Sequence, residues 1–277
     1  MSTIAFSVFP SAPPLRRDIE CIRLAVHTGT EALTVKTCPN GLPGIVFQMG
    51  QGGSAISSIS TRSAKTANVP VLFLHGLGAE PSVMQFTAGP FSTIQVVFKP
   101  HALYSVFHID SSTLRGGFWL PHEFGGAHLT KPLVSARSHG ERITILSEFL
   151  IARLAQGIRR DELVEASLAS IHERIETISV HELAETFNIS LRQLEKRFSR
   201  VVGMPPKLYI RIKRVNEALH LISTGRYERL SDIAYALNFY DQPHFIREIK
   251  TFSWVTPTSI AQKVSEFRQD QTGASYL

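Results

Sequence analysis

Two segments in the last hundred residues share one pattern, and this repeat constrains the fold more than any other feature of the sequence. The first is HELAETFNISLRQLEKRF (181–198) and the second is SDIAYALNFYDQPHFIREIK (231–250). Both read apolar-Ala-x-x-apolar-Asn-apolar, followed by a helix-capping residue and then by apolar residues at helical spacing, with one extra residue in the second copy. This periodicity predicts a helix on each side of the Asn in both copies.

The small residue and the Asn each have a physical reason in a helix-turn-helix. Two helices that cross at a steep angle need a small side chain where they approach, and Ala184 and Ala234 supply it. The turn between the helices needs a residue with positive φ, and Asn tolerates this conformation best after Gly. Asn188 and Asn238 are therefore predicted to be the turn residues of two helix-turn-helix units.

The second helix of each unit is predicted to bury an apolar face and to expose the opposite, polar one. The residues predicted to face inward are Leu191, Leu194 and Phe198 in the first unit and Phe245, Ile249 and Phe252 in the second. The polar side chains on the opposite faces are able to hydrogen-bond base edges in the major groove of DNA. These candidate base-reading residues are Arg192, Glu195, Lys196, Gln242, His244 and Arg247.

Positive charge is concentrated around the first unit. The chain carries a net charge of +6, whereas the segment from Arg192 to Arg214 alone contains eight basic residues and one acid, Glu195. A basic cluster inside a helical segment that also carries a DNA-reading motif is best explained by contacts to phosphates. The candidate phosphate contacts are Arg197, Arg200, Lys207, Arg211, Lys213, Arg214 and Lys250.

The C-terminal third resembles the DNA-binding domain of the AraC/XylS family of transcriptional regulators, over 178–222 and 229–260. The first family signature is matched by Leu183-Ala184, Ser190, Arg192, Leu194, Lys196 and Phe198. The second is matched by Phe239-Tyr240, Asp241-Gln242, Phe245, Arg247 and Thr256-Pro257. The chain departs from the family in having Asn for the usual turn Gly, Pro243-His244 for a small polar residue and Tyr, and Trp254 for Gly.

The resemblance implies that the two recognition helices enter successive major grooves on one face of the DNA. A connecting helix from Pro206 to about Ser223 would span roughly 27 Å at about 1.5 Å per residue, which fits a rigid spacer between grooves about 34 Å apart. The segment SARSHGERITILSEFLIARL (135–154) is similar to the helix that follows the sensor half in a subgroup of the family. In this family the sensor half often binds a small effector and often dimerises.

The first hundred residues predict a different kind of structure. Short runs rich in β-branched and aromatic residues are separated by Gly and Pro turns, without helices between them, which favours a β-sandwich or a small barrel. The predicted strands are 32–38, 44–49, 69–75, 82–88 and 92–98. A short helix is predicted at 101–107, and a long amphipathic helix begins near Ser138.

These patterns together predict an α+β chain. A β-rich N-terminal domain with trailing helices precedes an all-α domain in which a long helix joins two helix-turn-helix units. The predicted boundaries are 1–157 for a sensor or dimerisation domain, 158–177 for a linker helix, 178–265 for the DNA-binding domain and 266–277 for a C-terminal tail. The two units are expected at about 179–201 and 231–252.

Motifs that would indicate an enzyme or a metal site are missing from the sequence. The segment VPVLFLHGLG (69–78) is similar to the strand and turn near the oxyanion hole of α/β-hydrolases, but no Gly-x-Ser-x-Gly nucleophile elbow occurs. A cluster of potential metal ligands lacks the spacing that places two imidazoles on one helix face. These residues are His101, His108, His122, Glu123 and His128. We therefore expect no catalytic residue, no metal and no cofactor.

The N-terminus and the cysteines favour a reduced, cytoplasmic protein. The chain starts without the features of a secretory signal, and no apolar run reaches the roughly 20 residues of a membrane helix. Cys21 and Cys38 are two thiols without CxxC spacing, so a disulfide is not expected.

The expected function is sequence-specific binding of double-stranded DNA in transcription regulation, controlled by a small effector or a partner at the N-terminal domain. The expected partners besides DNA are RNA polymerase and a second copy of the chain, bound through the N-terminal domain or the helix at 138–156. The alternative is a small-molecule-binding β-domain protein whose helical region mediates protein contacts only. The sequence identifies neither the effector nor the target promoter, and it does not separate activation from repression.

Overall fold

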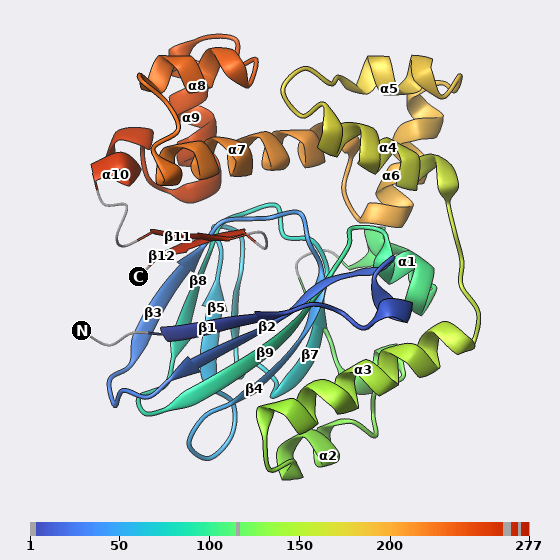
Figure 1. Ribbon diagram of the computed structural model, residues 1–277, viewed down its shortest axis with the longest axis vertical. Coiled ribbons are helices and arrows are strands. Elements are labelled where there is room, and N and C mark those ends of the chain that lie inside the picture. The colour runs from blue at the N-terminus through green and yellow to red at the C-terminus, as the bar shows by residue number, and fades with distance from the viewer. Residues whose placement is uncertain (1–3, 115–116, 263–266, 271–272, 277) are drawn as a thin grey trace.

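A β-domain and a helical domain lie one above the other in the computed structural model, which describes residues 4–114, 117–262, 267–270 and 273–276. Two six-stranded sheets form the β-domain, and the helices α4 to α10 lie across one end of them (Figure 1). The predicted α+β architecture, with β-structure first and helices after it, is confirmed.

The first sheet is antiparallel throughout, in the order β1-β2-β9-β4-β7-β10. Its strands are β1 (Ile4–Phe9), β2 (Ile19–His27), β4 (Gly44–Met49), β7 (Leu72–His75), β9 (Phe91–Phe98) and β10 (Phe118–Trp119). The central strands β4 and β9 carry Ile45, Phe47 and Ile94, which are at most 1% exposed and belong to one core cluster. Large apolar side chains of this kind fit the pleated, buried surface of a central strand.

The second sheet has the order β11-β12-β3-β8-β5-β6. Its strands are β3 (Leu33–Thr37), β5 (Ile56–Ser60), β6 (Lys65–Ala67), β8 (Ser82–Phe86), β11 (Phe267–Asp270) and β12 (Gly273–Tyr276). The strand β12 pairs with β3 in the register Ser275–Thr37 and Tyr276–Lys36. The described part of the predicted tail at 266–277 is therefore a strand pair on the N-terminal domain, whereas its first residue lies outside the described residues.

The five predicted strands are present as β3, β4, β7, β8 and β9. Among the strands that were not predicted is β2, which at nine residues is the longest strand of the first sheet. Its apolar residues are interrupted by Glu20 and Arg23. The strand Ile19–His27 nevertheless lies between β1 and β9, and it is buried at most of its positions. Burial within the sheet thus stabilises this segment as a strand, although its local pattern mixes apolar and charged residues.

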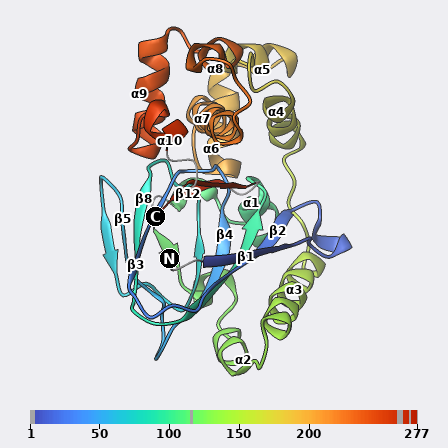
Figure 2. The same cartoon turned by 60° about the vertical axis from the view of Figure 1, so that its left-hand side comes forward.

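Three helices follow the strands of the β-domain: α1 (Ala102–Phe107), α2 (Thr130–Ser135) and α3 (His139–Ala155). The helix α3 begins after Ser138, whose hydroxyl accepts a hydrogen bond from the backbone N–H of Glu141. Its residues Leu146 and Leu150 are fully buried in the same core cluster as Ile94 of β9. In Figure 2, α2 and α3 lie beside the first sheet and away from the helical domain.

The helical domain consists of seven described helices. They are α4 (Glu162–Glu173), α5 (Val180–Thr186), α6 (Leu191–Val202), α7 (Pro206–Thr224), α8 (Leu230–Ala236), α9 (Gln242–Ser253) and α10 (Pro257–Gln262). The side chains of Ser179, Ser190 and Asp241 each accept a backbone N–H three residues further on, which satisfies a donor that a helix start leaves unpaired. The predicted limit of this domain at 265 lies outside the described residues.

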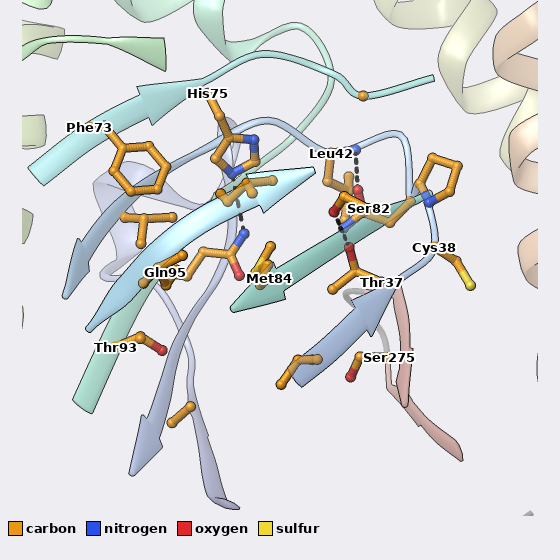
Figure 3. Close-up of a pocket in the computed structure, with 18 of the residues that line it drawn as sticks. Thr37, Cys38, Leu42, Phe73, His75, Ser82, Met84, Thr93, Gln95 and Ser275 are labelled. Carbon is orange, nitrogen blue, oxygen red and sulfur yellow. Dashed lines mark hydrogen bonds between the residues drawn. The ribbon is translucent and has the colours of Figure 1, made fainter. Parts of the chain in front are cut away.

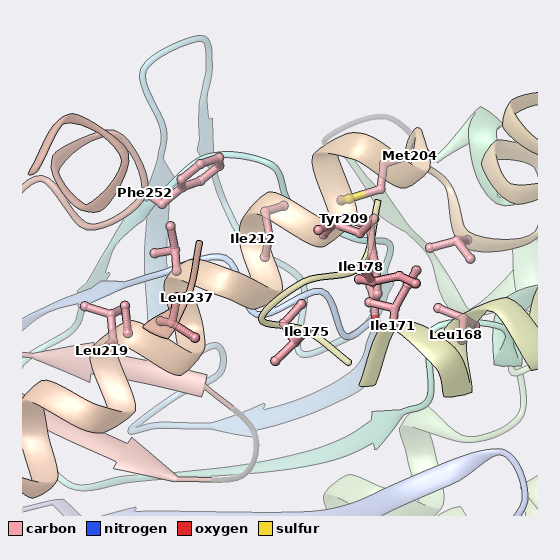
Figure 4. Close-up of a cluster of buried hydrophobic side chains, with 14 of the residues drawn as sticks. Leu168, Ile171, Ile175, Ile178, Met204, Tyr209, Ile212, Leu219, Leu237 and Phe252 are labelled. Carbon is pink, nitrogen blue, oxygen red and sulfur yellow. The ribbon is translucent and has the colours of Figure 1, made fainter. Parts of the chain in front are cut away.

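One hydrophobic core joins all parts of the helical domain (Figure 4). It includes Leu168 and Ile171 of α4 together with Phe198 of α6 and Tyr209 and Ile212 of α7. The segment predicted as a linker helix at 158–177 thus contains the first helix of the second domain. The chain passes between the two domains in the short stretch between α3 and α4.

Candidate nucleic-acid interface

The two predicted turns have the same backbone geometry. Asn188 has φ 50° and Asn238 has φ 53°, which is the left-handed conformation that the sequence analysis requires of them. In the first unit the N–H of Asn188 bonds the carbonyl of Glu185 and the N–H of Ile189 bonds that of Ala184, both at 3.0 Å. The second unit repeats both bonds at the equivalent positions, at 3.0 and 2.9 Å. Each first helix therefore ends in a Schellman motif that redirects the chain into the second helix.

The packing between the helices of each unit is equally matched. Ala184 and Ala234 are both 4% exposed, so each small side chain lies in the contact between two helices. Phe198 of α6 and Phe245 of α9 are both completely buried. The geometry is that of two helix-turn-helix units, α5–α6 and α8–α9, with α7 between them (Figure 1).

The second helix of each unit exposes most of the candidate base-reading residues. On α6 the exposed candidates are Arg192, Glu195 and Lys196, and on α9 they are Gln242 and Arg247. His244 is only partly exposed, with its ring centroid 5.8 Å from that of Phe239. Its reach toward a base is therefore smaller than the sequence suggested.

The inward face of α6 is narrower than predicted. Leu194 and Phe198 are fully buried, but Leu191 is 38% exposed because it is the first residue of the helix. Sequence reasoning also missed two exposed aromatic residues of the second unit, Tyr235 at 85% and Tyr240 at 92%. Tyr240 immediately precedes the cap of α9, and a tyrosine hydroxyl at such a position is able to bind a phosphate. The aromatic pair at 239–240 was a sufficient signal for it.

Two of the candidate phosphate contacts on α6 bind other parts of the protein. The guanidinium of Arg197 forms hydrogen bonds of 2.7 and 3.1 Å to the carboxylate of Asp161, the residue that caps α4. This hydrogen bonding raises the pKa of Arg197. Arg200 donates to the hydroxyl of Tyr104 at 2.7 Å and lies over its ring. These contacts hold α6 in place, and the phosphate role of both side chains stays a prediction.

Two arginines of α7 also have partners within the protein. Arg211 forms a double hydrogen bond, at 2.8 and 2.9 Å, with the carboxylate of Glu248 on α9, which raises its pKa. Arg214 donates to the backbone carbonyls of Ile175 and Ile178 at 2.9 and 3.0 Å. Both side chains therefore brace helices of the domain against one another instead of extending toward a ligand.

Lys213 of α7 faces the β-domain. Its aliphatic chain lies beside Gly41, and burial lowers its pKa. Of the seven candidates, Lys207 and Lys250 remain exposed without a contact of this kind among those that the structure describes. The phosphate role stays a prediction for all seven residues, and Lys207 and Lys250 are the two that are most available for it.

The first recognition helix is fixed to the β-domain at its C-terminal end. Ser111 of the β-domain donates its hydroxyl to the carbonyl of Val201 at 2.8 Å, in a buried position. Gly203, with φ 96°, follows at the end of α6, and a Cβ there would lie 2.9 Å from the carbonyl oxygen of Ser111. Only glycine fits this backbone conformation and this close approach. The position of α6 is thus linked directly to the β-domain.

A cavity of about 300 Å³ lies inside the β-domain, between the two sheets (Figure 3). Its walls are mainly apolar, with Phe73 and Met84 among the lining residues. Polar groups within it pair with one another: Gln95 lies 3.4 Å from Nε2 of His75, and the hydroxyls of Thr37 and Ser82 are 2.7 Å apart. An apolar enclosure with a few convergent polar groups is typical of a small-molecule site.

The hydrogen bonds around His75 define its protonation state. Burial lowers the pKa of His75, against a smaller opposing effect of the hydrogen bond to the carbonyl of Gly76. Since that carbonyl only accepts, Nδ1 carries the proton, and Nε2 is left to accept from the amide of Gln95. The polar spot of the cavity is therefore a neutral imidazole next to an amide.

One end of the cavity reaches the helical domain. Cys38, Pro39 and Asn40 line the cavity, and the carbonyl of Pro39 accepts a hydrogen bond of 2.7 Å from Nδ2 of Asn216 on α7. Burial raises the pKa of Cys38 to about 12, so its thiol is neutral and unreactive. The loop after β3 therefore forms one wall of the cavity and also contacts the helix that joins the two helix-turn-helix units.

No group of three or more His, Cys, Asp or Glu with the arrangement of a metal site occurs among the described residues. Within the same part of the chain, no helix is long and apolar enough to cross a membrane.

Comparison with known proteins adds to this geometry. Residues 183–263 match a family model described as a helix-turn-helix domain, and residues 7–118 match a domain of unknown function. A transcriptional activator RhaS of Enterobacter sp. is 34% identical over 88 residues, 31% of each chain. The RhaS of Citrobacter koseri is 28% identical over 127 residues, 42% of this chain and 45% of the relative. The chain thus matches less than half the length of these curated relatives.

Solved structures of lower similarity cover more of the chain. ToxT of Vibrio cholerae is 12% identical, with 87% of this chain and 97% of ToxT covered at a TM-score of 0.47. The paired units define a domain of the helix-turn-helix class. Over this helical domain the chain is similar to the AraC/XylS family of transcriptional regulators, as the match at residues 183–263 and the two repeated turns indicate.

Proposed function

We propose that this protein regulates transcription by binding a specific sequence of duplex DNA through α6 and α9. The observation that carries the proposal is the exact repetition of the turn hydrogen bonds at Asn188 and Asn238, because a plain helical bundle does not require it. The exposed faces of α6 and α9 follow the two turns, so two polar helices are presented to a ligand. Two such helices on one rigid connector fit adjacent major grooves.

Within this proposal, Arg192 is the residue best placed to read a base. It lies in the first turn of α6 and is exposed, and the described residues include no hydrogen-bond or ion-pair partner for its side chain. Arginine binds O6 and N7 of guanine with two hydrogen bonds, which contribute about 1–3 kcal/mol of discrimination. Lys196 follows one turn later on the same face, while Lys207 and Lys250 are proposed to contact phosphates. Arg247 is the equivalent candidate on α9.

The experiment is a selection of binding sites from random duplex DNA with the wild-type protein and with Arg192→Ala. We expect the wild type to select a defined sequence and the variant to lose preference at one or two adjacent base pairs, with its affinity for unrelated DNA nearly unchanged. Lys207→Ala serves as the matched control, which should weaken binding to all sequences alike. If Arg192→Ala selects the wild-type sequence with only lower affinity, Arg192 contacts phosphate and the base-reading role is wrong.

The rival function, a helical domain for protein contacts only, is decided by the same assay. A wild-type protein that selects no sequence and does not bind duplex DNA in a gel shift would support that rival. The absence of catalytic activity is part of our proposal as well, since the family consists of transcription regulators.

We also propose that the cavity between the sheets binds a small effector. Its mainly apolar walls, with a neutral polar spot at His75 and Gln95, favour a compact and mostly apolar molecule over a sugar. The loop at 38–40 connects this cavity to α7. An occupant of the cavity is thereby able to change the placement of the two helix-turn-helix units.

This site can be tested with the neutral fluorescent probe N-phenyl-1-naphthylamine. We expect saturable binding of about one probe per chain, and its loss in Thr93→Trp, because a large side chain at this cavity-lining position would fill the space. Lys65→Trp, on the exposed strand β6, is the control for an added indole. Equal probe binding by the wild type and Thr93→Trp would place the probe elsewhere and contradict the effector site.

Two further partners belong to the proposal. A cytoplasmic regulator of this family would act on RNA polymerase at a promoter. A second copy of the chain would pair through α3 or another part of the N-terminal domain, for which the exposed Ile151 on α3 and Val134 on α2 offer apolar surface, at 39% and 46% exposure.

A further inference from the structure

The turn between β5 and β6 meets the exposed face of the second recognition helix. Arg62 of this turn lines a surface groove together with residues of α9. The other lining residues are Pro243, Ile246, Arg247, Lys250 and Thr251. In Figure 2, β5 lies on the same side of the molecule as α9 and below it. A segment of the N-terminal domain thus lies next to the helix proposed to enter the major groove.

The turn that carries Arg62 is held in one conformation. Its ends are joined by the hydrogen bond from the N–H of Thr61 to the carbonyl of Ala64, at 2.7 Å. The carboxylate of Glu80 accepts hydrogen bonds from the backbone N–H and the hydroxyl of Ser63, at 3.2 and 3.0 Å. Arg62 is therefore presented from a fixed backbone, and less conformational entropy is lost when its side chain binds a ligand.

The charges around this groove are all of one sign. Arg62, Arg247 and Lys250 line it, and none of the described residues that line it is an acid. Cations that share a groove repel one another. The repulsion between the turn and α9 therefore argues against a role of these three side chains in holding the two segments together. An anion between them would remove the repulsion, which is the arrangement found where protein side chains flank a phosphate.

We propose that Arg62 binds a backbone phosphate of the DNA at the edge of the major groove that α9 enters. The N-terminal domain would then contribute directly to DNA binding, beside its role as an effector domain. The inference rests on the proposed function, because it requires that α9 binds DNA. It adds a contact from outside the helical domain to the two helix-turn-helix units.

The test compares Arg62→Ala with the wild type on two duplexes, the sequence that the wild type selects and a scrambled duplex of equal length. We expect a loss of affinity of about threefold to tenfold on both duplexes, and a plot of log affinity against log salt concentration that is flatter by about one unit. Lys65→Ala is the matched control, since Lys65 is an exposed cation of the same hairpin that does not line the groove. It should leave both quantities unchanged.

Other results would overturn the inference in distinct ways. A higher affinity of Arg62→Ala would mean that the turn shields α9 from DNA, and an unchanged salt dependence would mean that Arg62 meets no phosphate. Arg62→Glu should weaken binding further than Arg62→Ala, and equal binding by these two variants also contradicts the contact. Failure of the wild type to bind either duplex would instead refute the proposed function, so the two failures are distinguishable.

Discussion

Replacing Arg160 by alanine is expected to destabilise the protein by about 3–5 kcal/mol, the usual cost of leaving one charge of a buried ion pair without its partner. The guanidinium of Arg160 forms two hydrogen bonds, at 2.7 and 2.8 Å, with the carboxylate of Asp18. The side chain of Asp18 is only 2% exposed. Ser105 donates to the same carboxylate at 2.7 Å, and His101 lies 3.4 Å from it. Urea denaturation of the wild type and the variant measures the difference.

The control for Arg160→Ala is Arg17→Ala. Arg17 also forms an ion pair, 3.1 Å from Glu165, but its side chain is 61% exposed. Exposed pairs of this kind contribute about 0–1 kcal/mol. Equal losses in the two variants would show that burial of Asp18 does not determine the strength of the pair, and the argument for Arg160 would then be wrong.

The stability difference predicted between the wild type and Arg160→Ala depends on pH, because it comes from the ion pair with the carboxylate of Asp18. Burial alone would raise the pKa of Asp18, but hydrogen bonds from His101, Arg160 and Ser105 outweigh burial and hold the pKa well below its ordinary value of 3.8. A group whose pKa is lowered on folding stabilises the protein above its ordinary pKa and loses that contribution as the pH falls. The difference between the wild type and Arg160→Ala should therefore be largest near neutral pH and should shrink below about pH 4.

Replacing Phe198 by alanine is expected to cost about 3–5 kcal/mol and to abolish specific DNA binding. Phe198 is completely buried in the core shared by the helices, with its ring centroid 5.6 Å from that of Tyr209 on α7. The removed ring would leave a cavity between α6 and α7, which together set the position of the first recognition helix. Thermal denaturation and gel-shift titration measure the two effects.

Leu191→Ala is the matched control for Phe198→Ala on the same helix. Leu191 is 38% exposed, and a substitution at such a position should change stability by no more than about 0.5 kcal/mol. A loss in Leu191→Ala comparable with that in Phe198→Ala would contradict the buried face that the structure gives to α6.

The features that were predictable from sequence are those that local physics determines. The φ requirement at Asn188 and Asn238, the small residues at Ala184 and Ala234 and the capping residues act over a few positions of the chain. Their pattern is therefore visible in the sequence, and its repetition made the fold of the helical domain predictable.

The roles of the basic residues were not predictable in the same way. Arg197, Arg211 and Arg214 look alike in a sequence, and what separates them from Lys207 is the position of distant partners such as Asp161 and Glu248. These partners lie tens of residues away, so only the packing of the helices brings them together. A local excess of positive charge thus did not show which basic side chains have partners within the protein.

The N-terminal domain was predictable as a class of structure but not strand by strand. Its central strands β4 and β9 carry no charged residue and were found, whereas Ile19–His27 mixes charged and apolar residues and was missed. The pairing of β12 with β3 depends on a contact between the two ends of the chain, and no local pattern encodes such a contact. The cavity is also a product of how the two sheets pack, which a sequence does not show.

The position of β12 changes how the two domains can move. The chain leaves the β-domain between α3 and α4, and its last strands return to pair with β3 and to contact α7. The helical domain is therefore tethered at both of its ends, whereas an appended module would hang from a single linker. Together with the contacts of α6 to Ser111 and of α7 to Pro39, these two connections leave the domains little freedom to move independently. A shift of the loop after β3 would therefore reach both helix-turn-helix units through α7, because Pro39 of this loop is bonded to Asn216.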